Sequence, residues 1–434
     1  MPRMPRIVPR AALSLALCAC ASAPREIAAP PVPPVPAVPE DTVLALLDRR
    51  DYFRLRDLSS GLPDTPVGWL ARVQTAAAFN DPARSNAIIR EALARPLPDD
   101  ERFELLELRA GNDLSLYRYA DAYTAARRAL EVRAAGDSAE ADQLANLSRA
   151  FAALRDAPQQ TVIRRGGVKL RLDGGGFDLA MLPLTVNDSV RSYVLDTGAN
   201  FSTIMRSEAL AVGMRIRPAG FRVGTSTDRE VTADLAVADR LTIGDVEVRN
   251  AVFMVMDDEA LTFPDSVRIP GIVGFPVIEA LGELRLSGRR ELEVPSAAPR
   301  RTARNLALEG QTPITPVSWL GERFVCELDT GADTSQFFYP FFRRFRTRIE
   351  AAARPDTARY AGAGGSQAYP GYRMPRMRLA VGDTTVAVDS VFIHSQPSAD
   401  PDERDFPACR IGQDVLAAYE RYVLNFRDMA FLLL

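Results

Sequence analysis

The spacing of hydrophobic residues divides the chain into a helical first part and a β-rich remainder. Over residues 41–158, apolar side chains recur three or four positions apart, which is the spacing of one face of an α-helix. Asp81-Pro82 is typical of a helix start, with an N-cap residue followed by proline at the first helical position. From Thr161 onward the pattern changes to short β-type runs broken by Gly, Asp and Asn. We therefore predict a multidomain α and β protein.

The helical part is expected to form hairpins, because its apolar runs are separated by short turns. Tyr119–Leu130 resembles the second helix of a tetratricopeptide repeat, and Ala92-Leu93 lies 37 positions before Ala129-Leu130. One interpretation is a groove that binds a peptide or a protein partner. The other is a helical cap that packs on the domain after it.

Residues 1–20 have the charged, apolar and small-residue zones of a secretory signal. Leu17-Cys18-Ala19-Cys20 resembles a bacterial lipobox, which implies lipidation at Cys20, although Cys18 departs from the usual residue. A plain signal peptide cut near residues 21–23 is the alternative. The apolar run is far shorter than the roughly 20 residues of a transmembrane helix.

Residues 21–40 are rich in proline and predict an extended spacer between this leader and the helical domain. A spacer behind a lipid anchor would hold the rest of the protein away from the membrane. We expect an exported protein, periplasm-facing or attached to the outer membrane as a lipoprotein.

One short stretch of the β-rich part occurs twice. Val194–Asn200 reads Val-Leu-Asp-Thr-Gly-Ala-Asn, and Cys326–Asp333 ends in Leu-Asp-Thr-Gly-Ala-Asp. In each copy, β-prone residues run into an Asp and a tight turn, so Asp196 and Asp329 are placed at strand ends. A single Asp-Thr-Gly would be read as an ordinary turn. Because the motif occurs twice in similar surroundings, it indicates a functional site rather than an ordinary turn.

Two further landmarks repeat in the same order. Arg240–Asp245 is echoed by Arg378–Asp383, and Val273-Gly274 by Ile411-Gly412, each at an offset of 138 residues. The two Asp loops are offset by 133. Agreement of three landmarks indicates an internal duplication, with one domain over residues 161–298 and the other over 303–434.

Both Asp loops resemble the active-site loop of retropepsin-like aspartic proteases, and the arrangement resembles a bacterial tandem-domain member. The resemblance implies two closed β-barrel domains of the acid-protease type facing each other across one site. It implies that Asp196 and Asp329 are the catalytic pair. The residues that follow them support the loops: the hydroxyls bond across to the opposite loop and the glycines give room to turn, at Thr197, Gly198, Thr330 and Gly331.

The same resemblance implies a Gly-rich flap in each half and an apolar-apolar-Gly element beside each Asp loop. The first flap candidate contains Gly224 and Thr225, and the second contains Gly362 and Gly364. Arg410 departs from the pattern, because it stands where an apolar residue is usual. The resemblance also makes a disulfide between Cys326 and Cys409 feasible, with two buried free thiols as the alternative.

The composition removes several other classes of protein. His394 is the single histidine, so a Ser-His-Asp or Cys-His enzyme would depend on it and a histidine-rich metal site is excluded. It ends the apolar run Val391–Ile393, which predicts a strand-end or loop position. The net charge is −3 and no block of basic residues occurs, so we expect no nucleic-acid partner. We expect no metal and no cofactor.

The predicted function is an aspartic endopeptidase that activates a water between Asp196 and Asp329 and acts on a peptide or an unfolded protein. The sequence does not assign the shared proton to either carboxyl. Two alternatives use the same fold: a non-catalytic, peptide-binding scaffold lipoprotein of the envelope, and a site in which each half pairs with a half of another chain.

Overall fold

The computed structural model describes residues 37–174, 179–224, 230–263, 267–288, 290–362, 365–382, 384–398 and 406–434. The predicted signal peptide, with Cys20, and the linker up to residue 36 lie outside these ranges. From Ala37 onward, the described residues pack as one compact unit. No helix within them is long and apolar enough to cross a membrane.

The first part of this unit is helical. Its elements are α1 (Glu40–Asp48), α2 (Tyr52–Asp57), η1 (Ser59–Gly61), α3 (Pro66–Ala78), α4 (Pro82–Leu93), α5 (Asp99–Ser115), α6 (Tyr119–Val132) and α7 (Ala139–Leu154). The predicted start of α4 is confirmed, because the Asp81 carboxylate accepts a hydrogen bond of 3.0 Å from the Arg84 N–H and Pro82 is the first helical residue. Small alanines on α6 let it pack closely on α5 and α7, with Ala122, Ala126 and Ala129 fully buried.

Helix α7 packs along the strand β7 (Ile216–Gly224) of the β-rich part. The Asn146 side chain accepts from the Arg222 N–H and donates to its carbonyl, both at 2.8 Å. Arg149 donates to the Gly220 carbonyl at 2.9 Å. The edge of β7 is therefore satisfied by side chains of a helix rather than by another strand.

The residues after the helices form a large sheet of nine strands. Its neighbour order is β1-β9-β6-β10-β5-β4-β8-β7, and β3 pairs with β4. The bounds are β1 (Thr161–Arg164), β3 (Asp173–Gly174), β4 (Ala180–Val186), β5 (Ser189–Leu195), β6 (Ser202–Met205), β8 (Glu230–Ile243), β9 (Val246–Met256) and β10 (Gly271–Val273), with the short helices α8 (Arg206–Ala211), η3 (Asp258–Leu261) and α9 (Phe275–Ala280).

A second sheet of eight strands follows, in the order β13-β14-β15-β20-β16-β19-β18-β17. The bounds are β13 (Ala307–Glu309), β14 (Thr312–Trp319), β15 (Glu322–Leu328), β16 (Gln336–Phe337), β17 (Arg354–Gly362), β18 (Gly365–Val381), β19 (Thr384–His394) and β20 (Cys409–Ile411), with α10 (Tyr339–Ala352) and α11 (Gln413–Leu416).

The two sheets repeat one neighbour order. In the first, β4, β5, β10, β6, β9 and β8 follow one another, and β8 also pairs with β4. In the second, β14, β15, β20, β16, β19 and β18 follow in the same way, and β18 also pairs with β14. Each half therefore contains a circuit of paired strands in which the Asp-loop strand, β5 or β15, lies next to the short strand β10 or β20.

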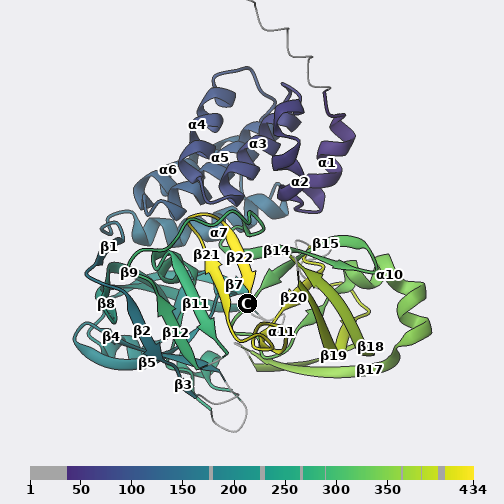
Figure 1. Ribbon diagram of the computed structural model, residues 1–434. Coiled ribbons are helices and arrows are strands. Elements are labelled where there is room, and N and C mark those ends of the chain that lie inside the picture. The colour runs from purple at the N-terminus through teal and green to yellow at the C-terminus, as the bar shows by residue number, and fades with distance from the viewer. Residues whose placement is uncertain are drawn as a thin grey trace, which may run out of the picture. The chain divides into compact units, whose positions relative to one another are not determined.

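A third sheet joins the two halves. Its five strands run in the order β2-β12-β11-β21-β22, and Figure 1 shows the C-terminal strands β21 and β22 beside β11. The bounds are β2 (Val168–Arg171), β11 (Glu283–Ser287), β12 (Glu291–Val294), β21 (Tyr422–Asn425) and β22 (Ala430–Leu433). The ring of Phe426 also meets that of Phe275 edge-to-face, with centroids 5.3 Å apart. The pairing of β11 with β21 makes this sheet common to both halves.

Candidate active site

Asp196 directly follows β5, whose last three residues are buried. Strand β5 runs parallel to β10, with Val194 opposite Ile272 and Leu195 opposite Val273. The Asp196 N–H donates to the Val273 carbonyl at 3.1 Å, which fixes the backbone at the point where the strand ends. The apolar residues of β5 and β10 thus set the position from which the Asp196 side chain leaves.

Asp329 has the same setting in the second half. Strand β15 runs parallel to β20, with Glu327 opposite Arg410 and Leu328 opposite Ile411. The Asp329 N–H donates to the Ile411 carbonyl at 3.0 Å. These partners match those of the first half at the offsets of 133 and 138 seen in the sequence.

The structure brings the two carboxyl groups together. Besides burial, the charge of Asp329 acts on Asp196 at close range and raises the pKa of that carboxyl. Each carboxyl also lies against the glycine of the opposite loop. A Cβ atom on Gly198 would stand 2.7 Å from the Asp329 Cγ, and one on Gly331 would stand 2.5 Å from the Asp196 Cγ. Only glycine leaves room for this approach.

Two threonines fasten the loops to each other. The Thr197 N–H donates to Thr330 Oγ1, and the Thr330 N–H donates to Thr197 Oγ1, both at 3.0 Å. Each hydroxyl then donates across the same boundary, from Thr197 to the Leu328 carbonyl at 2.8 Å and from Thr330 to the Leu195 carbonyl at 2.9 Å. Both threonines are buried, so these bonds have no competition from water.

Burial raises the pKa of Asp196 to about 8, and the neighbouring charge of Asp329 acts in the same direction. The Gly198 N–H, which donates to Asp196 Oδ1 at 2.8 Å, and the Arg410 guanidinium oppose this rise in the pKa. Two carboxyls in contact cannot both ionise cheaply, so the pair holds one proton near neutral pH. One member can then act as an acid and the other as a base.

A serine in each half was missed by the sequence reasoning. Ser202 Oγ accepts from the Gly274 N–H at 3.1 Å, and Ser335 Oγ accepts from the Gly412 N–H at 2.9 Å. Both serines are buried, and each stands six residues after its Asp. They tie the loop to the apolar-apolar-Gly element behind it. The equal spacing from Asp was the signal that could have revealed them.

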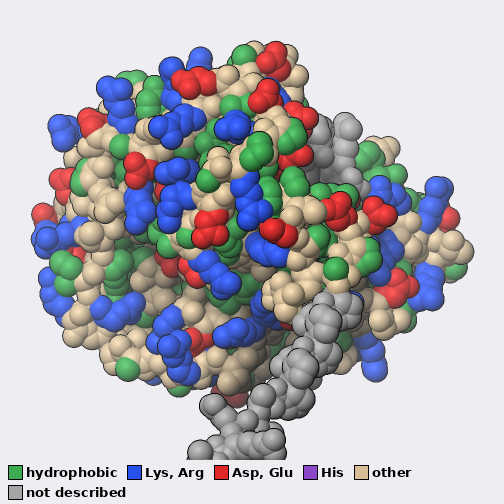
Figure 2. Space-filling model, turned by 90° about the horizontal axis from the view of Figure 1, so that it is seen from above, with side chains coloured by type: hydrophobic (Ala, Val, Ile, Leu, Met, Phe, Trp, Pro, Cys, Tyr) green, Lys and Arg blue, Asp and Glu red, His purple; other side chains and the backbone are tan. Residues whose placement is uncertain are grey.

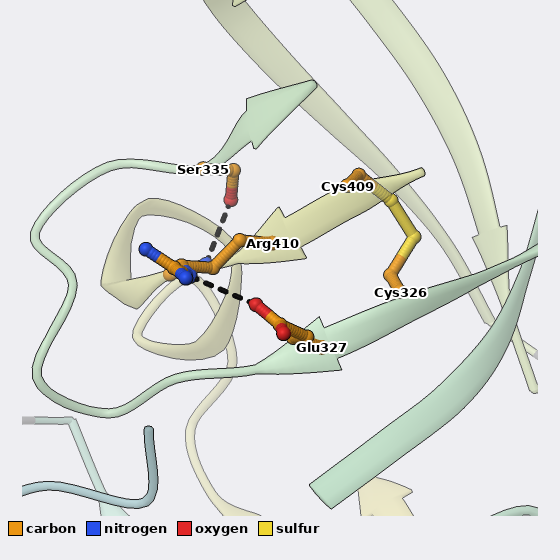
Figure 3. Close-up of a disulfide and its surroundings, with 6 residues drawn as sticks. Cys326, Glu327, Ser335, Cys409 and Arg410 are labelled. Carbon is orange, nitrogen blue, oxygen red and sulfur yellow. Dashed lines mark hydrogen bonds and ion pairs between the residues drawn. A yellow bond between two sulfur atoms is a disulfide. The ribbon is translucent and has the colours of Figure 1, made fainter. Parts of the chain in front are cut away.

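Arg410 occupies the position where the sequence pattern favours an apolar residue, and the structure supplies its partners. Figure 3 shows Arg410 on β20 and Glu327 on β15 pointing toward each other. The Arg410 Nε lies 3.0 Å from Glu327 Oε2 and 3.4 Å from Asp329 Oδ2. The charge at this position is therefore matched by carboxylates at the site.

Cys326 and Cys409 form a disulfide beside the same strand pair (Figure 3). The two residues lie opposite each other in the parallel register of β15 and β20, with Cα atoms 4.7 Å apart. Both are fully buried. The crosslink therefore joins the strand that leads into Asp329 to the strand that supports its loop.

Two of the four flap candidates, Gly224 and Gly362, are strand ends in two antiparallel hairpins. Gly224 ends β7, and Gly362 ends β17, where it stands opposite Gly365. Thr225 and Gly364 lie outside the described residues. The first hairpin is the one held by α7.

His394 is the last residue of β19, which confirms the strand-end prediction. Its Nε2 lies 3.1 Å from Gln336 Oε1, and the rings of Phe338, Tyr369 and Phe392 surround it at 5.0 to 5.3 Å. Burial, with a smaller effect of Arg410, lowers the pKa of His394 to about 4, so the imidazole is neutral at neutral pH. Within the described ranges, no three His, Cys, Asp or Glu residues are arranged to hold a metal ion.

Residues 182–277, which include the first Asp loop, match the model of the family described as aspartyl protease. The fold is similar to that of a retropepsin-like aspartic protease from Rickettsia conorii, at 14% identity, a TM-score of 0.22, and coverage of 32% of this chain and 99% of that one. It is also similar to basic 7S globulin from soybean, at 12% identity, a TM-score of 0.36, and coverage of 61% and 93%. A search of curated proteins found no match. The functional interpretation rests on the family match and on the residues of the site.

Proposed function

We propose that this protein is an aspartic endopeptidase whose single active site is formed by Asp196 and Asp329 of one chain. The observation that carries the proposal is the position of the two carboxyls, each of which lies against the glycine of the opposite loop. The family match over residues 182–277 supports it independently.

The chemistry follows from one proton shared by two carboxyls. The ionised member draws a proton from a bound water, which attacks the peptide carbonyl directly. The protonated member polarises that carbonyl and then helps to protonate the leaving amine. The threonine bonds between the loops keep both groups in place during this exchange, because they leave the carboxyls little freedom to separate.

The test is cleavage of an unfolded protein by the parent and by Asp196→Asn and Asp329→Asn. We expect each variant to lose at least about a hundredfold in rate, because an amide cannot exchange the proton. Asp188→Asn is the matched control, since that side chain is 80% exposed and pairs with Arg240 away from the site. Full activity in either dyad variant would refute the shared site. Binding of a statine-type peptide by a parent that cleaves nothing would identify a peptide-binding scaffold instead.

We also propose that the chain is exported and anchored through lipidated Cys20, and that the helical domain engages a protein partner. The leader sequence supports the first part. On the face seen in Figure 2, basic and acidic side chains are intermixed rather than gathered into one block of either sign. Metabolic labelling with a fatty acid, compared between the parent and Cys20→Ala, tests the anchor. Equal labelling would refute it.

A further inference from the structure

The two halves of the site differ in charge at one pair of equivalent positions. In the first half, the residue two positions before Asp196 is Val194, which lies opposite Ile272. In the second half the equivalent pair is Glu327 and Arg410. The register is the same, so an apolar contact in one half is replaced by an ion pair in the other. The site is therefore electrostatically asymmetric although its backbone is duplicated.

Arg410, which pairs with Glu327, also lies close enough to Asp329 to act on its carboxylate. Its Nε bonds Glu327 at 3.0 Å and lies 3.4 Å from Asp329 Oδ2, and its guanidinium stands 5.5 Å from the centre of the Phe338 ring. The side chains of Glu327 and Asp329 are only 13% and 12% exposed, and that of Arg410 is 26% exposed. Charges this sheltered from water interact strongly.

The backbone adds to the same asymmetry. Asp329 Oδ1 accepts from the N–H groups of Gly331 and Ala332, at 2.8 and 2.9 Å. Asp196 Oδ1 accepts from the Gly198 N–H at 2.8 Å, which is the one backbone donor that the described residues give it. A carboxyl with more donors, and with a cation beside it, is stabilised in its ionised form.

We propose that Arg410 is a positioning residue that holds Asp329 as the ionised member of the pair and leaves the shared proton on Asp196. The proposal rests on the function proposed above and adds a role for each carboxyl: Asp329 activates the water, and Asp196 polarises the substrate carbonyl. Among the described residues, Arg410 on β20 lies within ion-pair distance of Asp329, and Glu327 on β15 pairs with Arg410. His394 on β19 is neutral near neutral pH and adds no charge there.

Substitutions at Arg410 and at Glu327 should shift the pH profile of cleavage in opposite directions. Arg410→Ile removes the cation beside Asp329, so both limbs of the pH profile of kcat/KM move upward by about one pH unit or more. Glu327→Gln removes a neighbouring anion, so both limbs move downward. Arg410→Lys keeps a cation and restores most of the parent profile. Arg376→Ile is the matched control, because its side chain is 63% exposed and pairs with Asp389 on the outside of the sheet.

A second experiment measures the ionisation of the two carboxyls directly and does not depend on catalysis. In protein labelled with ¹³C at the aspartate carboxyl carbon, NMR titration gives the ionisation of Asp196 and Asp329, assigned with Asp196→Asn and Asp329→Asn. We expect Asp329 to be ionised and Asp196 protonated at about pH 6. The reverse order would overturn the proposal. An inactive parent with the expected order would refute the protease function and leave the role of Arg410 standing.

Arg410→Ile alone leaves Glu327 without that cation and could misfold for this reason. A double variant that also replaces Glu327 avoids the problem. Glu327→Val with Arg410→Ile copies the apolar pair Val194 and Ile272 of the first half into the second. We expect the titrations of the two aspartates to move closer together than in the parent. Unchanged titrations in both Arg410→Ile and the double variant would overturn the proposal.

Discussion

Thr197 and Thr330 each donate a backbone N–H to the hydroxyl of the other, at 3.0 Å in both directions. Replacing either with valine keeps the shape but leaves a buried N–H and a carbonyl without their partner. We expect each variant to lose about 1 to 3 kcal/mol of unfolding free energy, and to lose activity as the loops separate. Urea unfolding and peptide cleavage measure the two effects.

The matched controls are Thr197→Ser and Thr330→Ser, which keep the hydroxyl and should retain most of the stability and the rate. If the valine and serine variants behave alike, the hydroxyl bonds do not hold the loops together.

Gly198 and Gly331 are expected to tolerate no side chain. An added Cβ would lie 2.7 and 2.5 Å from the carboxyl carbon of the opposite Asp, so Gly198→Ala and Gly331→Ala must push that carboxyl away. The rate of cleavage should fall by about tenfold or more, as expected when a reacting group is displaced. Gly111→Ala is the control, because a Cβ there meets no atom within 4 Å. Normal activity in the loop variants would contradict the close approach.

The disulfide is expected to stabilise the second half. Cys326 and Cys409 are separated by 83 residues. A disulfide typically contributes about 2 to 4 kcal/mol, and more when the loop that it closes is long. Changing both cysteines to alanine should lower the unfolding free energy by this amount. Adding a reductant during urea unfolding is the control: it should destabilise the parent and leave the double variant unchanged. A parent insensitive to the reductant after full unfolding would show that the crosslink contributes nothing.

Glu283 carries a buried charge in the sheet that joins the halves. Burial favours its neutral form, but hydrogen bonds from Arg301, Asn425 and Arg285 outweigh it and lower the pKa of Glu283 to about 2. The group therefore stabilises the fold above about pH 4.5, and this contribution is lost as the pH falls toward 2. Glu283→Gln should cost about 3 to 5 kcal/mol at neutral pH, because Arg301 loses its carboxylate partner while Arg285 keeps only Glu293.

Urea unfolding across an acidic pH series tests this, with the exposed Glu291→Gln of the adjacent strand β12 as the control. The difference between the parent and Glu283→Gln should shrink as the pH falls. A constant difference would mean that the charge of Glu283 is not what stabilises the sheet.

The contribution of Asp196 to stability changes with pH in the opposite direction to that of Glu283. The pKa of this carboxyl is raised from its usual value of 3.8 to about 8, so its contribution to stability is complete below about pH 4 and is lost as the pH rises toward 8. Asp196→Asn stays neutral at every pH. The unfolding free energy of the variant should therefore fall less than that of the parent between about pH 5 and 8, while Asp188→Asn should follow the parent.

Much of the fold can be predicted from short, local patterns in the sequence. The Asp loops, the Gly-Asp hairpins and the apolar-apolar-Gly elements are short, so the sequence displays them directly, and their offsets of 133 and 138 predict a repeat. In the structure the strands around them repeat one order, and helices precede them. The N-cap at Asp81 and the strand end at His394 were predicted from neighbouring residues alone.

Contacts between residues that lie far apart in the sequence could not be predicted from such local patterns. Arg410 looked like a departure from the pattern, because its partner Glu327 lies 83 positions earlier and is reached only through the parallel pairing of β15 and β20. The pairing of Glu283 with Asn425 spans 142 positions. Neither follows from periodicity, because strand partners are chosen by the packing of the whole molecule.

The sheet shared by β11 and β21 has a consequence for how the protein responds to dilution. Two Asp loops on separate chains would meet less often as the concentration falls, and the site would be lost by dissociation. Here one covalent chain supplies both loops, so their encounter is intramolecular and its effective concentration is fixed by the fold. The cleavage rate per molecule is expected to stay constant at concentrations where a two-chain site would come apart.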